Sequence, residues 1–209
     1  DLTTGPAAGI ATMILADFGA EVLVVRRPGE DTFDNQPAFP MWSRGKKSVE
    51  LNLDKSDERK IFETLCTAAD VLFCNWRSSS LKRRGLDYGS VHERHPHLIF
   101  CHVSGFGSHG PHADYPGYEH IVAAVTGRMR LFERIVERDG PVFSALQVGI
   151  HACAQNAAAG TLAALLERGD EGQGRLVETS LLQGLLPYEQ GAMLGVQFRD
   201  RFPELFPPT

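Results

Sequence analysis

The chain has 209 residues, of which 43% are hydrophobic and 22% charged, a composition that supports a packed core and argues against disorder. Its net charge of −5 argues against a protein that binds nucleic acid by broad phosphate neutralisation. No stretch reaches the roughly 18 apolar residues that a membrane span requires, so no membrane association is expected. The four cysteines, Cys66, Cys74, Cys101 and Cys153, are expected to be buried free thiols, which fits a reducing cytoplasm.

The first third of the chain predicts two helices and two strands. Apolar residues at helical spacing predict a helix from Gly5 to Phe18, and the apolar run 21–25 predicts a buried strand. The polar, proline-containing stretch from Glu30 to Met41 predicts a long loop. Alternating residues 48–53 predict a second strand, and residues 54–68 predict the next helix.

The middle of the chain continues this alternation. Residues 70–75 predict a buried strand, followed by short helices over 78–84 and 87–95, which Gly85 separates. Residues 98–103 predict a further strand, which runs into a glycine-rich loop.

The last part contains longer helices. Residues 117–130 predict a helix, and the alanine-rich segment 149–168, apolar on most faces, predicts a core helix. A strand is predicted over 175–178 and a final helix over 179–196, interrupted at Pro187. Regular alternation of strands and helices predicts an α/β fold with a mainly parallel, doubly wound sheet, in which ligands bind beyond the carboxyl ends of the strands.

Several well-known sites are missing from the sequence. Gly5 and Gly9 are not followed by a third correctly placed glycine, and no G-x-x-x-x-G-K-[ST] pattern occurs, which argues against a nicotinamide-dependent dehydrogenase or a P-loop NTPase. No His, Cys and Asp cluster has zinc-site spacing, and no G-x-S-x-G elbow is present. We therefore expect neither a metal nor a nicotinamide cofactor.

Basic residues gather where predicted strands end. Arg26 and Arg27 follow one strand, and Arg77 follows another, directly after Trp76. These positions share the carboxyl edge of a parallel sheet, where arginines suit the phosphates of a polyanionic cofactor and Trp76 suits its adenine. The alternative interpretation is a solvated charged rim.

The glycine loop and the histidines each permit two interpretations. Gly105 and Gly107 let the backbone approach a ligand, or they meet only the needs of a loop with positive φ. His151, at the start of the alanine-rich helix, is either a core histidine or a site residue. The other notable histidines fall around a predicted helix end and are expected to be exposed: His92, His95 and His97.

Ordered motifs along the whole chain resemble those of the family III CoA-transferases. This group, also called CaiB/BaiF, includes formyl-CoA transferases, carnitine CoA-transferase and α-methylacyl-CoA racemase. The matching segments are Gly5-Pro6, residues 15–22, Ser43-Arg44-Gly45-Lys46-Lys47-Ser48, residues 69–72 with Asn75-Trp76-Arg77, Ser104-Gly105-Phe106-Gly107, Gly110-Pro111, Pro116-Gly117-Tyr118, residues 162–168 and Gly172-Gln173-Gly174. Ser43 replaces the family's usual Asn, and Ser78 and Ser79 replace its Pro-Gly.

The resemblance implies that residues 1–209 form a Rossmann-like, CoA-binding large domain of an interlocked homodimer. It also implies a small domain and a C-terminal returning segment outside this chain. Coenzyme A or an acyl-CoA, together with a carboxylic acid, would be the substrates. The candidate CoA-binding residues are Arg44, Lys46, Trp76, Arg77, Arg83, Arg84, Gly105, Phe106 and Gly107.

The resemblance also places the catalytic aspartate of the family near the start of the long apolar helix. That aspartate attacks the acyl-CoA thioester and forms a mixed anhydride. Counting along the helix puts it at Gly149 or Ile150, neither of which is a nucleophile. His151 and Glu119 are weak substitutes. The His-Asp pair of the racemase variant falls on Tyr118 and Glu119.

Three functions follow from these observations. The first is a CoA-transferase-like protein that moves CoA between an acyl-CoA thioester and a carboxylic acid. The second, suggested by the missing aspartate, is a non-catalytic CoA-binding half or subunit of a tandem or paired protein. The third is an acyl-CoA racemase, dehydratase or lyase on the same scaffold.

Overall fold

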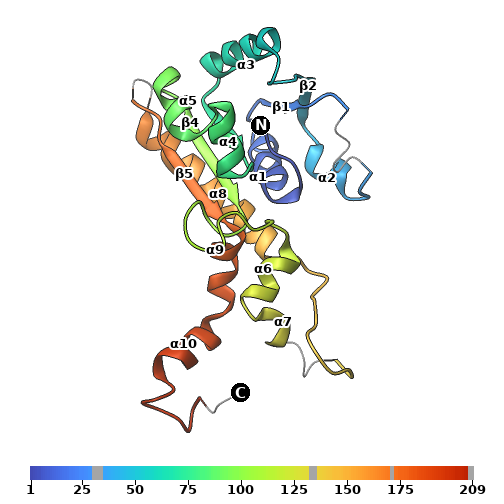
Figure 1. Ribbon diagram of the computed structural model, residues 1–209, viewed down its shortest axis with the longest axis vertical. Helices are drawn as coiled ribbons and strands as arrows, with labels where there is room; N and C mark the ends of the chain where they lie inside the picture. The colour runs from blue at the N-terminus through green and yellow to red at the C-terminus, as the bar shows by residue number, and fades with distance from the viewer. Residues whose placement is uncertain (30–34, 132–135, 170–171, 207–209) are drawn as a thin grey trace.

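The computed structural model describes residues 1–29, 35–131, 136–169 and 172–206, and it confirms an α/β fold with parallel strands (Figure 1). The strands divide into two parallel sheets, one of order β1-β2 and one of order β3-β4-β5. Their bounds are β1 Val22–Arg26, β2 Lys46–Glu50, β3 Val71–Cys74, β4 Ile99–Ser104 and β5 Leu176–Ser180.

Residues 1 and 2 join the two sheets. The backbone N–H of Leu2 donates to the carbonyl of Phe73 in β3 at 2.8 Å, and the N–H of Val25 in β1 donates to the carbonyl of Asp1 at 2.9 Å. The single doubly wound sheet expected from the sequence is therefore interrupted between β1 and β3, and this short extended segment lies in the gap.

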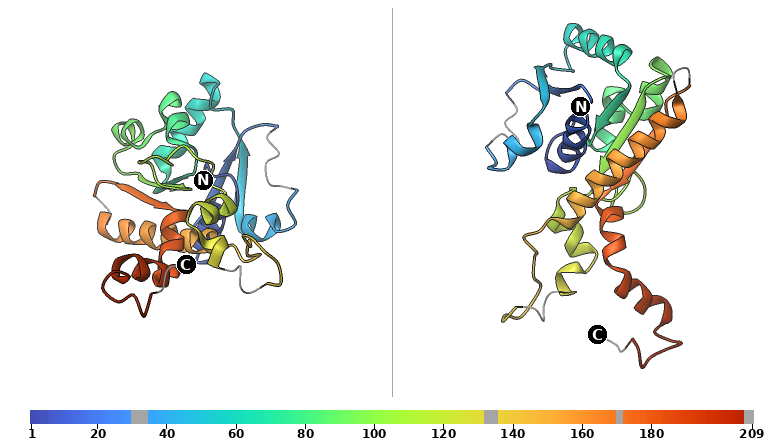
Figure 2. Two further views of the ribbon diagram at one scale, coloured as in Figure 1. Left: turned by 60° about the horizontal axis from the view of Figure 1, so that its bottom comes forward. Right: turned by 180° about the vertical axis from the view of Figure 1, so that it is seen from behind.

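Helices cover both faces of the three-stranded sheet (Figures 1 and 2). Side chains of a strand alternate between its faces, so Phe73 of β3 joins one buried cluster while Leu72 and Cys74 join the other. The first cluster contains α1 (Pro6–Asp17) and α8 (Val148–Arg168). The second contains α3 (Ser56–Ala68), α4 (Ser78–Arg84) and α5 (Tyr88–Arg94). All four cysteines are free and buried in these clusters, as expected.

Two predicted segments differ from the structure. The end of the predicted loop forms a short helix, α2 (Phe39–Ser43), because Trp42 packs against α1 where Gly9 leaves room; a Cβ on Gly9 would lie 2.8 Å from Trp42 Cδ1. Residues 30–34 of that loop lie outside the described residues. The helix predicted over 117–130 is two helices, α6 (Glu119–Val125) and α7 (Arg128–Leu131), because Gly127 adopts a φ of +76° between them.

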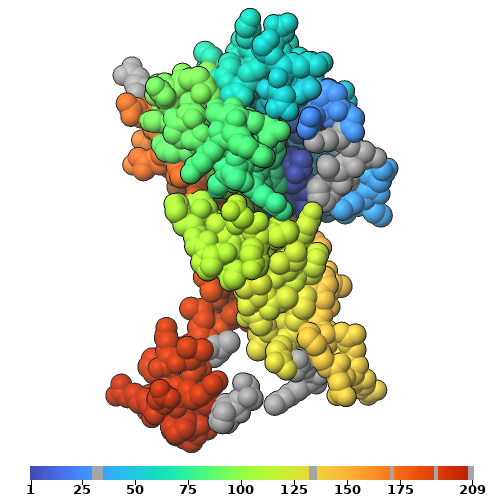
Figure 3. Space-filling model, in the orientation of Figure 1, coloured from blue at the N-terminus to red at the C-terminus, as the bar shows by residue number. Residues whose placement is uncertain are grey.

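Residues 176–198 also contain more separate elements than the sequence predicted. β5 continues through Ser180, and the following helical part consists of α9 (Leu181–Leu185), a 3₁₀ turn (Leu186–Tyr188) and α10 (Gln190–Phe198). Two projections extend from the body of the molecule, one with α6 and α7 and the other with α10 (Figures 1 and 3). Among the described residues, none of the helices combines the length and apolar character needed to cross a membrane.

Candidate functional site

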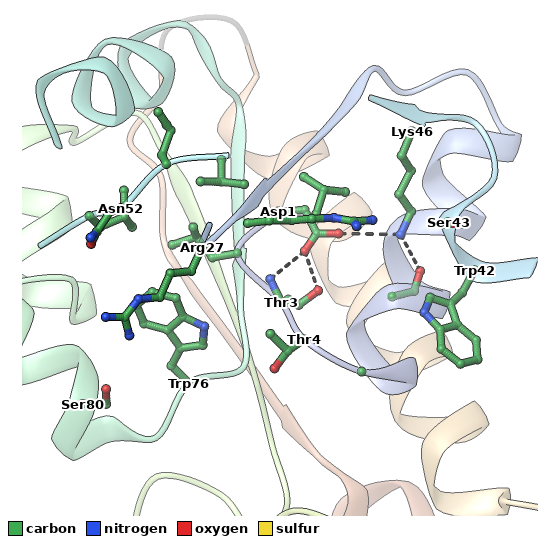
Figure 4. Close-up of a pocket in the computed structure, with 18 of the residues that line it drawn as sticks. Asp1, Thr3, Thr4, Arg27, Trp42, Ser43, Lys46, Asn52, Trp76 and Ser80 are labelled. Carbon is green, nitrogen blue, oxygen red and sulfur yellow. Dashed lines mark hydrogen bonds and ion pairs between the residues drawn. The ribbon is translucent and has the colours of Figure 1, made fainter. Parts of the chain in front are cut away.

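A cavity of about 400 Å³ lies at the carboxyl ends of β1, β2 and β3 and extends along β1 to Lys46, the first residue of β2 (Figure 4). This is the edge of a parallel sheet at which ligands are expected. Its lining includes cationic and aromatic side chains. The cationic ones are Arg26, Arg27, Lys46 and Arg84, and the aromatic ones are Phe39, Trp42 and Trp76.

One end of the cavity combines an aromatic ring with two guanidinium groups. The guanidinium carbon of Arg84 lies 5.7 Å from the centroid of the Trp76 ring. Arg84 Nη1 donates to Ser80 Oγ at 2.8 Å, and Arg84 Nε donates to Asp54 Oδ1 at 3.1 Å. Arg27 forms an ion pair with the other oxygen of Asp54 at 3.6 Å. These five residues are called the arginine end below.

The opposite end contains a buried ion pair. Lys46 Nζ lies 3.6 Å from Asp1 Oδ2 and donates to the carbonyl of Gly9 at 2.8 Å and to Thr12 Oγ1 at 2.7 Å. The Lys46 side chain is only 4% exposed, and burial together with the nearby charge of Arg26 lowers its pKa to about 8. Figure 4 shows Lys46 directed toward Asp1. Its ammonium group therefore ties β2 to α1 as well as lining the cavity.

Three of the CoA-binding residues predicted from the sequence line this cavity, namely Lys46, Trp76 and Arg84. Arg44 lies elsewhere and forms a two-pronged pair with Asp17, with distances of 3.1 and 2.5 Å. The hydrogen bonds from Arg44 lower the pKa of the Asp17 carboxyl. This pair joins the end of α1 to the segment before β2.

The remaining two predicted arginines lie on α4 but outside the cavity lining. Arg77 is exposed and precedes the first turn of α4, and Arg83 is exposed in its last turn. Arg84 is their neighbour, yet it alone of these three faces Trp76. Arg83 and Arg84 are adjacent on the helix and therefore point about 100° apart, whereas Arg77 is the N-cap residue, whose backbone is not helical.

The predicted glycine loop is explained by packing. A Cβ on Gly105 would lie 2.4 Å from the Cα of Gly117, so two backbone segments meet there without room for a side chain. Gly107 has a φ of +93°, which other residues rarely adopt. Phe106 is buried, and its ring centroid lies 5.9 Å from that of Tyr115. None of the three lines the 400 Å³ cavity.

Asp54 and Ser80 are parts of the arginine end that sequence reasoning missed. Ser80 carries no motif. Asp54 follows β2 by four residues, at the same sheet edge as Arg27 after β1. Applying the strand-end argument to acidic as well as basic residues would have found it.

Glu119 contacts the start of α8, where the sequence resemblance led us to expect the family's aspartate. The N–H groups of Gly149 and Ile150, in the first turn of α8, donate to Glu119 Oε1 at 2.8 Å and to Glu119 Oε2 at 2.7 Å. A Cβ on Gly149 would lie 2.8 Å from Glu119 Oε2 and 3.0 Å from Leu185 Cγ. No side chain therefore fits at residue 149 while Glu119 holds its position. Ile150 is buried.

Other reactive side chains near this helix start are poorly suited to nucleophilic attack. His151 is exposed, so the interpretation of His151 as a core histidine is wrong. Burial raises the pKa of the Cys153 thiol to about 12, which keeps it protonated near neutral pH. Tyr118 is largely exposed, and its ring stacks on His120 with centroids 5.7 Å apart.

The chemistry of the cavity suits an anionic ligand with an aromatic part. Guanidinium forks bind phosphate oxygens, and the Trp76 ring offers a face for a base. Within the described ranges, no three His, Cys, Asp or Glu side chains gather as a metal site would require. Fold and cavity together define a parallel α/β protein with a cationic ligand site at the carboxyl edge of its sheet.

Comparison with known proteins identifies which group of such proteins this is. The family model for CoA-transferase family III matches residues 1–204. The chain therefore belongs to CoA-transferase family III, as its sequence motifs indicated.

Individual relatives agree with this membership. The chain is 30% identical over 211 residues to cinnamoyl-CoA:phenyllactate CoA-transferase of Clostridium sporogenes, covering 93% of this chain and 50% of that protein. It is 32% identical over 192 residues to human succinyl-CoA:glutarate CoA-transferase, covering 87% and 43%. A crystal structure of a CaiB/BaiF family protein from Brucella suis superposes with a TM-score of 0.81 at 26% identity, covering 94% and 55%. The chain thus spans about half the length of these relatives.

Proposed function

We propose that this chain is the CoA-binding large domain of a protein that moves CoA between an acyl-CoA thioester and a carboxylic acid. The observation that carries the proposal is the arginine end of the cavity, where Arg84 contacts both Trp76 and Asp54. Family membership supports CoA as the ligand. The buried free cysteines support a reducing cytoplasm as the compartment.

Each part of the ligand has a counterpart in the cavity. The Trp76 ring would stack on the adenine, and the guanidinium groups of Arg84 and Arg27 would bind phosphate oxygens. The buried Lys46–Asp1 pair would hold the cavity wall, since a pKa of about 8 leaves Lys46 largely protonated at neutral pH and able to form this ion pair.

Counting from the family resemblance gives Gly149 or Ile150 at the place of the usual nucleophile for acyl transfer. Glu119 is the carboxylate closest to the position that the family's aspartate would take, but it is 4% exposed and both its oxygens accept backbone hydrogen bonds. Burial restricts the access of a thioester to this carboxylate, and the two hydrogen bonds stabilise its negative charge and so make it a weaker nucleophile.

This geometry favours a second candidate function, a non-catalytic CoA-binding half or subunit. In that case the chain would bind the nucleotide and the catalytic carboxylate would come from another chain or another part of the protein. Glu119 would then act as a cap for α8 rather than as a nucleophile.

One experiment separates the two functions. The intact protein is incubated with a panel of acyl-CoAs and free carboxylic acids, and CoA exchange is followed by mass spectrometry. Exchange that persists in Glu119→Gln and in His151→Ala would support a transferase whose carboxylate lies outside residues 1–209. Exchange abolished by Glu119→Gln, with CoA binding retained, would contradict the capping role. Absence of exchange together with CoA binding would support the non-catalytic function.

The partners would include a second copy of the chain. We propose a homodimer, interlocked as in the family, because the two projections expose large apolar side chains. Examples are Leu146 beside the first projection and Tyr188 and Val196 on the second. Covering such residues is favourable when another chain packs on them.

A further inference from the structure

Asp54 lies between two guanidinium groups of the arginine end. Its Oδ1 accepts a hydrogen bond from Arg84 Nε at 3.1 Å, and its Oδ2 lies 3.6 Å from Arg27 Nη2. Arg84 Nη2 also approaches Oδ2, at 3.5 Å. The carboxylate thus presents two oxygens to two arginines, which is the arrangement that a phosphate group would adopt at the same place.

Arg84 has two contacts that hold its guanidinium group in place without Asp54. Arg84 donates to Ser80 Oγ within α4 and lies over the Trp76 ring, and neither contact involves Asp54. The Asp54 side chain itself is 46% exposed, whereas that of Arg84 is 26% exposed. A carboxylate that faces water can move away readily, because water screens an exposed ion pair and solvates the released carboxylate.

We propose that Asp54 is an internal counter-ion that occupies the phosphate position of the cavity and lowers its affinity for phosphate-bearing ligands. The identity of that ligand as CoA rests on the proposed function. The counter-ion role needs only the arginines and the carboxylate. A ligand phosphate must displace Asp54 to reach Arg84 and Arg27, so Asp54 sets how tightly the phosphate end is held.

The test compares Asp54→Asn with a matched variant, Asp57→Asn. Both remove one negative charge at the start of the α3 region. Asp57, however, is 93% exposed, pairs only loosely with Lys60 at 3.9 Å, and lies outside the cavity lining. Asparagine at residue 54 keeps an oxygen that can accept from Arg84 while the net charge is lost. Thermal unfolding of both variants confirms that each is folded before binding is measured.

Binding is measured by calorimetry in the intact protein with three probes: inorganic pyrophosphate, CoA and phosphate-free pantetheine. We expect Asp54→Asn to bind pyrophosphate about threefold to tenfold more tightly than the wild type, with a gain that shrinks as salt is added. Asp57→Asn should match the wild type. Pantetheine should bind equally to all three proteins, because it has no phosphate to compete with Asp54.

The outcomes separate this proposal from the proposed function. Unchanged or weaker pyrophosphate binding in Asp54→Asn overturns the counter-ion role and makes Asp54 a group that positions the arginines. Tighter pyrophosphate binding without CoA binding in any variant supports the counter-ion role and contradicts CoA as the ligand. An equal gain in Asp57→Asn would assign the effect to net charge and overturn the proposal.

Discussion

At the residue scale, the Glu119 carboxylate lies where a side chain at residue 149 would otherwise lie, and it accepts hydrogen bonds from the start of α8. Two consecutive N–H groups at a helix start have no partner within the helix, and a buried carboxylate satisfies both while complementing the helix dipole. The same carboxylate fills the space that a side chain at residue 149 would need. The glycine at residue 149 and the position of Glu119 are therefore two aspects of one local arrangement.

This arrangement predicts a stability effect. Glu119→Gln should lower the free energy of unfolding by about 1–3 kcal/mol, because an amide supplies one acceptor oxygen and leaves one buried N–H without a partner. Urea denaturation measures the change. Glu167→Gln is the control, since Glu167 pairs with Arg175 at the surface, and it should change stability by less than about 0.5 kcal/mol. Equal effects in the two variants would argue against the capping role.

Glu63 predicts a pH dependence of stability. Burial alone would raise its pKa, but hydrogen bonds from His95 and Arg59 and the charge of Arg94 lower it from 4.5 to about 2. The folded state therefore binds this proton less readily than the unfolded state. The resulting stabilisation is complete above pH 4.5 and is lost as the pH falls toward 2.

Urea denaturation between pH 6 and pH 3 checks this expectation. The wild type should lose about 1–3 kcal/mol more than Glu63→Gln over that range, allowing for partial solvent screening. If the two proteins lose stability in parallel, the acid sensitivity comes from other carboxylates.

Residue types at strand ends were enough to predict part of the site, because Arg26, Arg27 and Trp76 line the cavity, although Arg77 does not. Of the arginines that only the family resemblance suggested, Arg84 lines the cavity and Arg44 and Arg83 do not. Sequence position places a residue near an edge, but the direction of a side chain depends on helix phase and on competing partners such as Asp17. The histidines show the same limit. His95 was expected to be exposed, yet it is buried 2.7 Å from Glu63 Oε2, and its neighbours His92 and His97 are half-buried.

At the element scale, two glycines allow the loop after β4 to cross the segment before α6. Gly105→Ala should destabilise the protein by at least about 2 kcal/mol, because the new Cβ would lie 2.4 Å from the Cα of Gly117. A backbone atom cannot move away as the end of a flexible side chain can. Gly89→Ala in α5 is the matched control. The nearest atom to its Cβ is Asp87 Oδ1 at 3.5 Å, so it should stabilise α5 by roughly 0.5 kcal/mol. Thermal unfolding of both variants measures the contrast, and equal shifts would contradict this packing.

Most elements could be predicted because their patterns are local. Continuous apolar runs predicted the buried strands, and β3 and β4 alternate between two helical layers as a doubly wound sheet requires. The failures come from interactions beyond the local pattern. Gly127 divides one predicted helix through its positive φ, and α2 forms where Trp42 reaches the small surface of Gly9.

At the scale of the whole molecule, the fold class followed from the order of elements, while the division into two sheets did not. That division depends on backbone hydrogen bonds of residues 1 and 2 with β1 and β3, which no residue pattern indicates. Counting along the helix predicted Gly149 or Ile150 where the resemblance implies an aspartate, but the contact of Glu119 with these two N–H groups depends on where α6 lies relative to α8, which no residue pattern indicates.

The proposed dimer predicts a change in assembly. Val196 of α10 is 81% exposed, and Val196→Glu should shift the protein from dimer toward monomer in light scattering after gel filtration. Thr64→Glu places the same charge on an exposed site of α3 and should leave the dimer intact. A wild type that is monomeric at high concentration would contradict the dimer.

The most direct measurement is calorimetric titration of CoA into the intact wild-type protein and into Trp76→Ala, Arg84→Ala and Lys82→Ala. Lys82 is exposed on α4 and does not line the cavity. We predict saturable binding of one CoA per chain. The affinity for CoA should fall about tenfold in Trp76→Ala and in Arg84→Ala and should be unchanged in Lys82→Ala. Absence of saturable binding, or binding that neither cavity variant weakens, would contradict this prediction.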